Sequence, residues 1–283
     1  MGTEKRERQK ANRQARLDEL ERSEKAEKRR SRLGLFAIIG AFVLGLLLLV
    51  RFAGGGDETV IEDPGLDPDA ITTTVPEAET AVITVPEPGA TITGETPCPA
   101  ADGSSERTTT FEAAPPLCID ATKTYTAEIS TTKGTYTVDL NAEEAPNTVN
   151  NFVVLARYHY YDGAPFHRII PDFVVQGGDS VGPTPGIGNP GYQFDDELPS
   201  AIPDSDNFYE SGSVAMANSG VNTNGSQFFV VTGANGEGLP PQYSRFGLVT
   251  EGMDVVLDIE SAGSPGGAPT EEILINSVTI TEN

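Results

Sequence analysis

An apolar run of 18 residues, LGLFAIIGAFVLGLLLLV at positions 33–50, limits what the whole chain can fold into. As a helix rising 1.5 Å per residue it would be about 27 Å long, close to the thickness of a bilayer core. Basic residues cluster just before it and only Arg51 follows directly, so the positive-inside rule puts the N-terminus in the cytoplasm. A cleaved signal peptide is disfavoured, because the charged region before the run is too long and an arginine stands where cleavage needs a small residue. We therefore predict a single-pass signal anchor at 33–51 that contacts the lipid bilayer through residues 33–50.

Charge is divided sharply at this segment. Residues 1–51 carry a net charge of +6 and residues 52–283 a net charge of −29, which gives −23 for the chain. A polyanion of this kind repels nucleic acid, so DNA and RNA binding are excluded for the C-terminal part. Two histidines and two cysteines are too few for a zinc site of the usual ligands, and no stretch resembles a calcium-binding EF-hand loop, although carboxylates could bind calcium in other ways. We expect a charged cytoplasmic tail at 1–32, no metal and no cofactor.

Composition changes again after the apolar run. Residues 54–97 are rich in Gly, Thr, Pro and Glu, which is typical of an extended, unpacked and disordered spacer. Cys98 and Cys118 flank its end, and a disulfide between them is permitted outside the membrane. Such a bridge would close a loop of about 20 residues and contribute roughly 3 kcal/mol. We predict a linker at 52–118 whose last segment is tied to the folded domain by this bridge; two free thiols are the alternative.

From residue 119 onward, short β-branched stretches alternate apolar and polar residues. TYTAEISTT and GTYTVDLN, at 124–132 and 134–141, predict a β-hairpin. Further strands are predicted at 168–176, 213–217, 227–233, 245–250 and 273–281. Helices are predicted at 145–161 and 253–261. The pattern favours an all-β antiparallel barrel with helices at its ends, in a domain at 119–283.

Two short patterns in this domain match known motifs without their structural context. GDSVG at 178–182 fits the G-x-S-x-G nucleophile elbow, but the proline- and glycine-rich segment after it cannot form the required helix. Both histidines also precede Ser180, which is the wrong order for a hydrolase of that kind. GIGNPG at 186–191 fits G-x-G-x-x-G, but it neither follows a strand nor opens a helix. We interpret it as a glycine-rich loop.

Three longer strings carry more information. They are FHRIIPDFVVQGGD at 166–179, SVAMANSGVNTNGSQFFV at 213–230 and LPPQYSRFGLVTEGM at 239–253. Together they resemble the cyclophilin family of peptidyl-prolyl cis–trans isomerases over about residues 122–283, here in a membrane-anchored, bacterial-like form. The resemblance implies an eight-stranded antiparallel barrel capped by two helices, preceded in this chain by one transmembrane helix and a disordered linker. It also implies isomerase (rotamase) activity in protein folding.

The resemblance assigns roles to individual residues. Arg168 matches the family's catalytic arginine, and Gln176 and Phe173 belong to the same catalytic group. The positions implied for substrate binding are Val174, Ala217, Asn218, Gln227, Phe229, Leu239 and Tyr243. Among these, Ala217 and Asn218 match the strand that pairs with the substrate backbone. We interpret His167 as structural.

The chain also departs from the family pattern. Gly238 stands where much of the family has tryptophan, Tyr243 where histidine is frequent, and Val174 where methionine is common. In the family the tryptophan matters most for binding the cyclic peptide cyclosporin, so the resemblance implies weak cyclosporin sensitivity. Tyr243 still offers a flat ring and a hydroxyl to the pocket.

A permanent cation suits the implied reaction. Rotation about an X-Pro bond breaks no covalent bond, and it is slow because the nitrogen lone pair is delocalised into the carbonyl. Arg168 would donate to the proline nitrogen as the lone pair localises, although a single arginine is more often a surface or salt-bridged residue. We expect a monomer outside the cytoplasm that binds proline-containing polypeptides and isomerises X-Pro bonds in exported proteins. The alternatives are a low-activity proline-peptide binding or chaperone module of the same fold, and an anchored structural protein without a peptide site.

Overall fold

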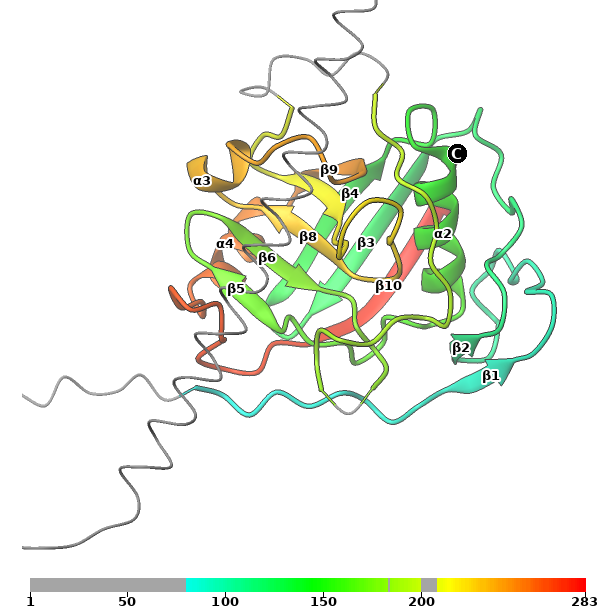
Figure 1. Cartoon of the computed structure of the whole chain (residues 1–283), viewed down its shortest axis with the longest axis horizontal. Helices are drawn as coiled ribbons and strands as arrows, with labels where there is room; N and C mark the ends of the chain where they lie inside the picture. The colour runs from blue at the N-terminus through cyan, green and yellow to red at the C-terminus, as the bar shows by residue number, and fades with distance from the viewer. Residues whose placement is uncertain (1–79, 183, 200–207) are drawn as a thin grey trace, which may run out of the picture. The chain divides into compact units, whose positions relative to one another are not determined.

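Eight strands form one antiparallel sheet in the computed structural model (Figure 1), which describes residues 80–182, 184–199 and 208–283. In chain order they are β3 (Tyr125–Thr131), β4 (Gly134–Leu140), β5 (Arg168–Ile170), β6 (Val174–Gly177), β7 (Ser213–Met216), β8 (Phe228–Val231), β9 (Arg245–Glu251) and β10 (Ile275–Glu282). Their order in the sheet is β10-β3-β4-β9-β7-β8-β6-β5, and every neighbouring pair is antiparallel. The prediction of an eight-stranded antiparallel architecture is therefore confirmed.

The first two strands of the sheet in chain order, β3 and β4, form the predicted β-hairpin. β3 and β4 pair in register from Thr131 opposite Gly134 to Tyr125 opposite Leu140. The Thr131 hydroxyl donates to the Gly134 carbonyl at 2.8 Å and accepts a bond from the Lys133 amide at 3.1 Å, which closes the turn. Alternate residues of β3 are buried, as expected for a strand with one face on a core.

The sheet curls until its two edges approach each other. β5 and β10 are the edge strands, and the segments that precede them meet at a bridge between Pro165 and Leu274. The Phe166 amide also donates to the Ile273 carbonyl at 2.9 Å. These contacts pair backbone groups that an open sheet would leave unpaired at its edges.

The segment predicted as one strand at 168–176 is instead two strands, β5 and β6. Pro171 has no backbone N–H to donate, and Asp172 has a φ of 58°, a left-handed conformation that reverses the chain. The two strands then pair with Arg168 directly opposite Gln176. This turn supplies the eighth strand of the sheet.

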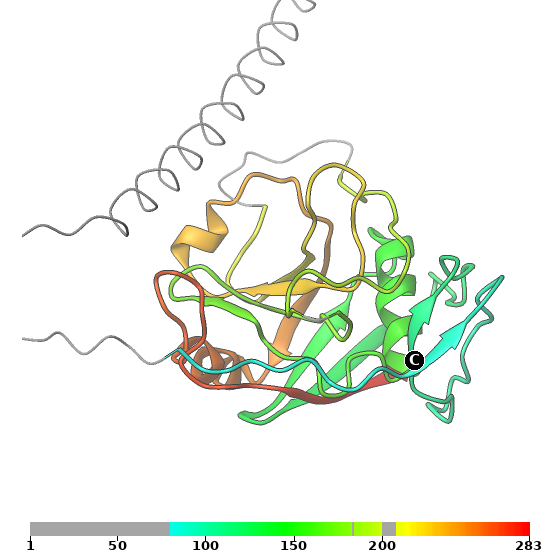
Figure 2. The ribbon, with the colours of Figure 1, turned by 60° about the horizontal axis from the view of Figure 1, so that its bottom comes forward.

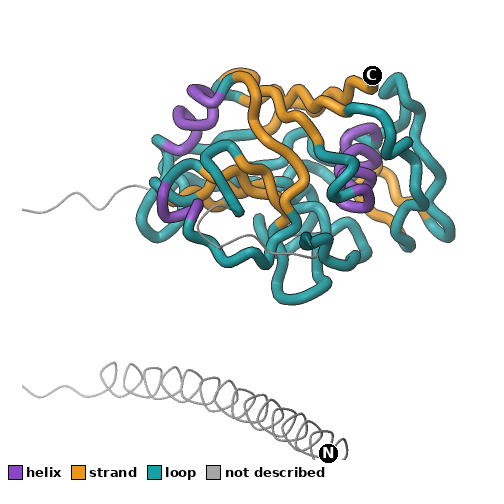
Figure 3. Tube along the Cα trace, turned by 90° about the horizontal axis from the view of Figure 1, so that it is seen from above, coloured by secondary structure: helices purple, strands orange, loops and turns teal. Residues whose placement is uncertain are grey.

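Helices lie at opposite ends of the described unit (Figure 3). They are α2 (Pro146–Arg157), the single turn α3 (Ala234–Glu237) and α4 (Met253–Glu260). The N-terminus of α2 is capped from a distant loop by Glu197, whose carboxylate accepts bonds from the Asn147 amide at 3.0 Å and the Thr148 amide at 2.7 Å. A carboxylate is well suited to this position because it satisfies free amides at the positive end of the helix dipole.

The predicted helix at 145–161 ends early, at Arg157. His159 has a φ of 55°, which a right-handed helix does not allow. The residues after Arg157 therefore form a turn, and Tyr160 and Tyr161 reach the core from that turn with no exposed surface.

Two groups of buried side chains stabilise the sheet. The main core is rich in aromatic residues, and the rings of Phe152, Tyr161 and Phe228 lie with centroids 5.1 to 5.7 Å apart. A smaller group, here called the apolar cluster, is separate from it. Its buried members are Val174, Phe208, Tyr209, Ala215, Phe229 and Val231.

The described part of the predicted linker is packed on the domain. Residues 80–118, here called the belt, include β1 (Ala90–Ile92) and β2 (Thr108–Phe111), which pair in parallel. In Figure 2 the belt, drawn in cyan to green, runs along the segment that leads into β10 and on toward α2. Phe111 is 1% exposed and belongs to the main core. The packed structure therefore begins well before the predicted boundary at residue 119.

A disulfide joins Cys98 and Cys118 within the belt, as the sequence predicted, with Cα atoms 5.4 Å apart. Asn150 of α2 accepts a bond from the Cys118 amide at 2.7 Å and donates to the Pro116 carbonyl at 2.9 Å. The bridge therefore closes a loop that α2 also holds in place.

The charged tail predicted at 1–32, the membrane segment at 33–51 and the first part of the linker lie outside the described residues. In the part of the chain that the structure describes, no helix is both long and apolar enough to cross a membrane.

Candidate active site

Arg168 is the first residue of β5, and its charge is held without being neutralised. Its Nη1 donates to Gln176 Oε1 at 3.2 Å, and its Cζ lies 5.5 Å from the centre of the Phe173 ring. Among the described residues, no carboxylate forms an ion pair with Arg168. A neutral amide and the face of an aromatic ring therefore orient the guanidinium and leave its positive charge available.

Two glutamine side chains, here called the amide relay, continue this contact. Gln176 Nε2 donates to Gln227 Oε1 at 3.1 Å. Gln227 Nε2 then donates to the carbonyls of Gly186, at 3.0 Å, and Gly188, at 3.2 Å. These carbonyls belong to the segment 186–191, here called the glycine loop. Every bond donates in the same direction, away from the guanidinium, so each amide has one orientation that satisfies it.

The apolar cluster beside the guanidinium contains the predicted pocket residues. Val174 and Phe229 are 2% and 4% exposed, and Phe173, Leu239 and Tyr243 pack against this cluster. The rings of Phe229 and Tyr243 meet edge to face, with centroids 5.4 Å apart and planes at 86°. Apolar walls lower the local dielectric and thereby strengthen the field of a nearby charge.

Ala217 and Asn218 follow the end of β7 and are not part of the strand. The Ala217 amide donates to the Gln227 carbonyl at 2.9 Å, and Ala217 also packs against the apolar cluster. Asn218 Nδ2 donates to the Gln242 carbonyl at 3.1 Å, which ties it to the loop that carries Tyr243. Both residues therefore lie next to the other predicted site residues.

Tyr209 supports the apolar cluster and was not predicted from the sequence. Its hydroxyl donates to the Tyr243 carbonyl at 2.8 Å and accepts a bond from the Tyr243 amide at 3.0 Å. Burial raises the pKa of Tyr209 to about 12, so the hydroxyl remains a donor at neutral pH. The only signal in the sequence was an aromatic pair at 208–209, and spacing cannot reveal a partner 34 residues away.

His167 directly precedes Arg168 in the chain but does not supply the cation. Burial lowers the pKa of His167, against a smaller opposite effect of the nearby Asp179 carboxylate. The imidazole is therefore neutral at pH 7, and Arg168 is the positive group of the site. In the described ranges, no group of three or more His, Cys, Asp and Glu side chains is arranged to hold a metal.

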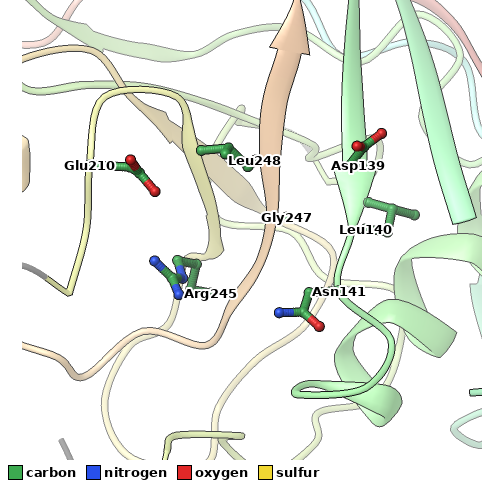
Figure 4. A pocket seen from close by; sticks show the side chains of 7 residues that line it. All are labelled: Asp139, Leu140, Asn141, Glu210, Arg245, Gly247 and Leu248. Atoms are coloured by element: carbon green, nitrogen blue, oxygen red, sulfur yellow. The ribbon is translucent and has the colours of Figure 1, made fainter. Parts of the chain in front are cut away.

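A polar hollow of about 330 Å³ opens beside the amide relay. Four predicted residues line it: Gln176, Ala217, Asn218 and Gln227. A hollow of similar size, about 340 Å³, is lined by residues of β4 and β9 and their neighbours, and it contains none of the predicted residues (Figure 4). Its arginine, Arg245, already donates to the Phe208 carbonyl at 2.8 Å. The candidate site therefore comprises the amide relay, the apolar cluster and the first hollow.

Comparisons with known proteins show the family of the chain. Residues 126–280 match the family model for "Cyclophilin type peptidyl-prolyl cis-trans isomerase/CLD". The chain is 43% identical over 129 residues to peptidyl-prolyl cis-trans isomerase ppi1 of Schizosaccharomyces pombe, covering 45% of this chain and 80% of that protein. It is 38% identical over 176 residues to peptidyl-prolyl cis-trans isomerase A of Mycobacterium tuberculosis, covering 56% of this chain and 93% of that protein. A solved cyclophilin-type isomerase of Cryptosporidium parvum is similar with a TM-score of 0.50 and 29% identity, covering 56% of this chain and 99% of that one.

An antiparallel curled sheet of eight strands, with Arg168 beside the apolar cluster, is consistent with the class of proline-directed isomerase that these comparisons show. The chain belongs to the cyclophilin-type peptidyl-prolyl cis–trans isomerase family, and it is an isomerase of that type.

Proposed function

We propose that this isomerase acts on X-Pro bonds of exported polypeptides outside the cytoplasm, with Arg168 as the catalytic donor. The observation that carries the proposal is the guanidinium held by Gln176 at the border of the apolar cluster, without a carboxylate partner in the described chain. In this proposal the proline ring rests on Phe173, Val174, Phe229 and Leu239, and the polar hollow receives neighbouring parts of the peptide.

The reaction needs a donor that favours a twisted amide. As the X-Pro bond rotates, the nitrogen lone pair withdraws from the carbonyl, and the nitrogen becomes basic and pyramidal. Arg168 donates an N–H to this nitrogen, which is a stronger acceptor in the transition state than in the planar ground state. Arginine suits the task because it is a donor only and carries a permanent charge.

The required lowering of the barrier is larger than one hydrogen bond from Arg168 can supply. The uncatalysed barrier is ~18–20 kcal/mol, and millisecond turnover needs an acceleration of roughly 10⁴–10⁵, or about 5.5–7 kcal/mol. One charge-assisted hydrogen bond contributes about 1.5–3 kcal/mol net. The apolar cluster provides the remainder by holding the ring and by excluding water from the guanidinium.

Two features of the chain support a location outside the cytoplasm. The uncharged run at 33–50 follows a basic segment, as in a signal anchor with a cytoplasmic N-terminus. The Cys98–Cys118 disulfide is of a kind that persists in oxidising compartments. Exported polypeptides are then the substrates that the enzyme meets.

An exchange assay on a proline-containing peptide tests the catalytic role. Arg168→Ala should lower kcat/KM by about 10- to 150-fold, the loss expected for one charge-assisted hydrogen bond. Lys133→Ala, which removes a cation from the β3–β4 turn, is the matched control and should keep the wild-type rate. An Arg168→Ala enzyme with an unchanged rate would show that the guanidinium is not the donor.

A proline-peptide binding or chaperone module with little turnover is the second candidate, and it rests on the departures at Gly238 and Tyr243. Gly238 ends the short helix α3, and Tyr243 fills part of the apolar cluster with its ring. The same assay separates the two functions, because a wild-type protein that binds the peptide by NMR titration without accelerating its exchange would be a binding module.

A further inference from the structure

The belt touches the glycine loop through Phe111. The Phe111 amide donates to the Pro190 carbonyl at 2.8 Å, and its ring packs edge-on against Tyr158 and Tyr192 with centroids 5.4 and 6.2 Å away. Gly191 permits this approach, because it has a φ of 108° and a Cβ there would lie 2.1 Å from the Phe111 carbonyl oxygen. The backbones of the belt and the glycine loop are therefore in direct contact at Phe111 and Gly191.

The glycine loop in turn sets the far end of the amide relay. The buried Asp179 carboxylate accepts bonds from the Gly186 amide at 2.7 Å and the Gly188 amide at 2.8 Å. The carbonyls of the same two residues accept both N–H groups of Gln227. A displacement of the loop would move these carbonyls and, through Gln227 and Gln176, the anchor of the guanidinium.

The other end of the belt is bonded to the segment 267–272, which pairs with the residue after Arg168. The Ala81 amide donates to the Pro269 carbonyl at 3.0 Å, and Thr84 donates from its amide and its hydroxyl to the Glu272 carboxylate at 2.8 and 2.6 Å. The segment that contains Pro269 and Glu272 begins at Gly267, whose carbonyl accepts a bond from the Ile169 amide at 2.9 Å. The belt is thus bonded both to the glycine loop and to the segment whose Gly267 pairs with Ile169, the residue after Arg168.

We propose that the belt is a positioning element of the isomerase site. Phe111 is its positioning residue, because it holds the glycine loop and through it the amide relay and Arg168. The Cys98–Cys118 bridge is the clasp that keeps β2 and Phe111 in place, so reduction of the bridge loosens the site. This inference rests on the catalytic role proposed for Arg168.

The first experiment compares Phe111→Ala with Val278→Ala in the full-length chain, purified in detergent. Val278 is also buried, at 6% exposure, but it lies on β10 and makes none of the belt contacts described above. Phe111→Ala should lower kcat by about tenfold with little change in KM, and it should shift the side-chain amide NMR resonances of Gln227. Val278→Ala should destabilise the fold while leaving kcat and those resonances as in the wild type. A Phe111→Ala enzyme with wild-type kcat, or with lower kcat and unmoved Gln227 resonances, would overturn the proposal.

Reduction of the wild-type enzyme gives a second perturbation that needs no core substitution. Dithiothreitol converts the bridge to two thiols and is itself oxidised to a cyclic disulfide. Reduced wild type should show the same direction of change in kcat and in the Gln227 resonances, and Cys98→Ser/Cys118→Ser should already show it without responding to dithiothreitol. If reduction leaves both readouts unchanged, the bridge is not a clasp for the site.

A double-mutant cycle separates this proposal from the proposed role of Arg168. If the belt acts through Arg168, Phe111→Ala should have little further effect on kcat in an Arg168→Ala background. Additive losses would show that the belt acts elsewhere, even if Arg168 is catalytic. A full rate in Arg168→Ala alone would instead refute the catalytic role of the arginine, while the Gln227 resonances would still report whether the belt positions the relay.

Discussion

Arg168 differs from Arg157 and Arg245 in the groups that its guanidinium meets. Arg157 pairs with the Glu282 carboxylate at 2.9 Å, and Arg245 lies 3.9 Å from the Glu144 carboxylate. Arg168 instead donates to the amide oxygen of Gln176. A carboxylate would have held the guanidinium equally well but would have cancelled its field, whereas an amide fixes its orientation and leaves the charge for a substrate.

The shape of the guanidinium is as important as its charge, and Arg168→Lys tests this. Lysine keeps the positive charge but presents a single ammonium group, which cannot keep the Gln176 contact and reach a proline nitrogen with the same geometry. We expect kcat/KM to fall by about tenfold or more, with the fold intact by circular dichroism. A lysine enzyme at the wild-type rate would mean that charge alone is sufficient.

The pH profile should reflect a site without a titrating catalytic group. The pKa of His167 is lowered by burial, with opposing contributions from Asp179 and Gln227 and a further lowering by Arg168. The imidazole is therefore neutral above its ordinary value of 6.5, and kcat/KM should be flat between about pH 6.5 and 8.5. A sigmoidal change of rate within this window would show that an ionising group takes part.

The lowered pKa of His167 should also make the stability of the fold depend on pH. Because the folded pKa lies below 6.5, the unfolded chain binds more protons as the pH falls, and His167 should make the fold less stable below pH 6.5. His167→Gln should reduce the fall in melting temperature between about pH 6.5 and 5. An identical fall in both proteins would assign it to other groups.

At this scale the sequence predicted most of the residues that the structure places together in the candidate site. The strings around Arg168, Gln227 and Leu239 are long and specific, and the structure brings their side chains together. The sequence did not reveal Tyr209 or the relay's attachment to the glycine loop, because both depend on contacts between segments that are distant in the chain. The pattern GIGNPG was correctly interpreted as a loop, but its carbonyls could be assigned a partner only in the folded chain.

At the scale of elements, a turn divides one predicted strand into two. Seven strands could be predicted from the sequence, because 168–176 contains one continuous apolar pattern. Pro171 and the left-handed Asp172 divide it, and the Phe173 amide closes the turn on the Ile170 carbonyl at 3.2 Å. The turn is what places Arg168 beside Gln176, so the element that was hardest to predict is also the one that builds the site.

Helix α2 owes its N-terminus to a residue that no local pattern identifies. Ala145 at the N-cap position makes no side-chain capping bond, and Glu197 caps the helix instead. Glu197→Gln should lower stability by about 1–2 kcal/mol, which shifts the melting temperature by roughly 2–8 °C, because the charge at the helix dipole is lost. Glu143→Gln, at an exposed position near the same helix, is the control and should leave the melting temperature unchanged. Equal melting temperatures for both variants would show that the carboxylate contributes nothing as a cap.

At the scale of the whole molecule, composition misled the prediction for residues 80–118. Proline, threonine and acidic residues suggested an unpacked chain, yet Thr96, Thr108 and Thr109 are buried and Phe111 lies in the core. A segment of low hydrophobicity can be ordered when a few side chains find sites prepared by the rest of the fold, and those sites are not encoded in the segment itself. The disulfide was predictable because the chain has only two cysteines, which leaves one possible intramolecular pair.

The division of charge at the apolar run predicts one orientation in the membrane. The tail before it, residues 1–32, has a net charge of +5 with Arg29, Arg30 and Arg32 next to the run, and residues 51–283 after it have a net charge of −28. In spheroplasts of a bacterium that expresses the full chain, protease added outside should remove the isomerase domain and leave the tail protected. Replacing Arg29, Arg30 and Arg32 with glutamate should weaken this orientation, whereas the same change at Arg6, Arg8 and Lys10, far from the run, should not. A domain that resists protease until the membrane is lysed would place the isomerase in the cytoplasm and would contradict exported proteins as its substrates.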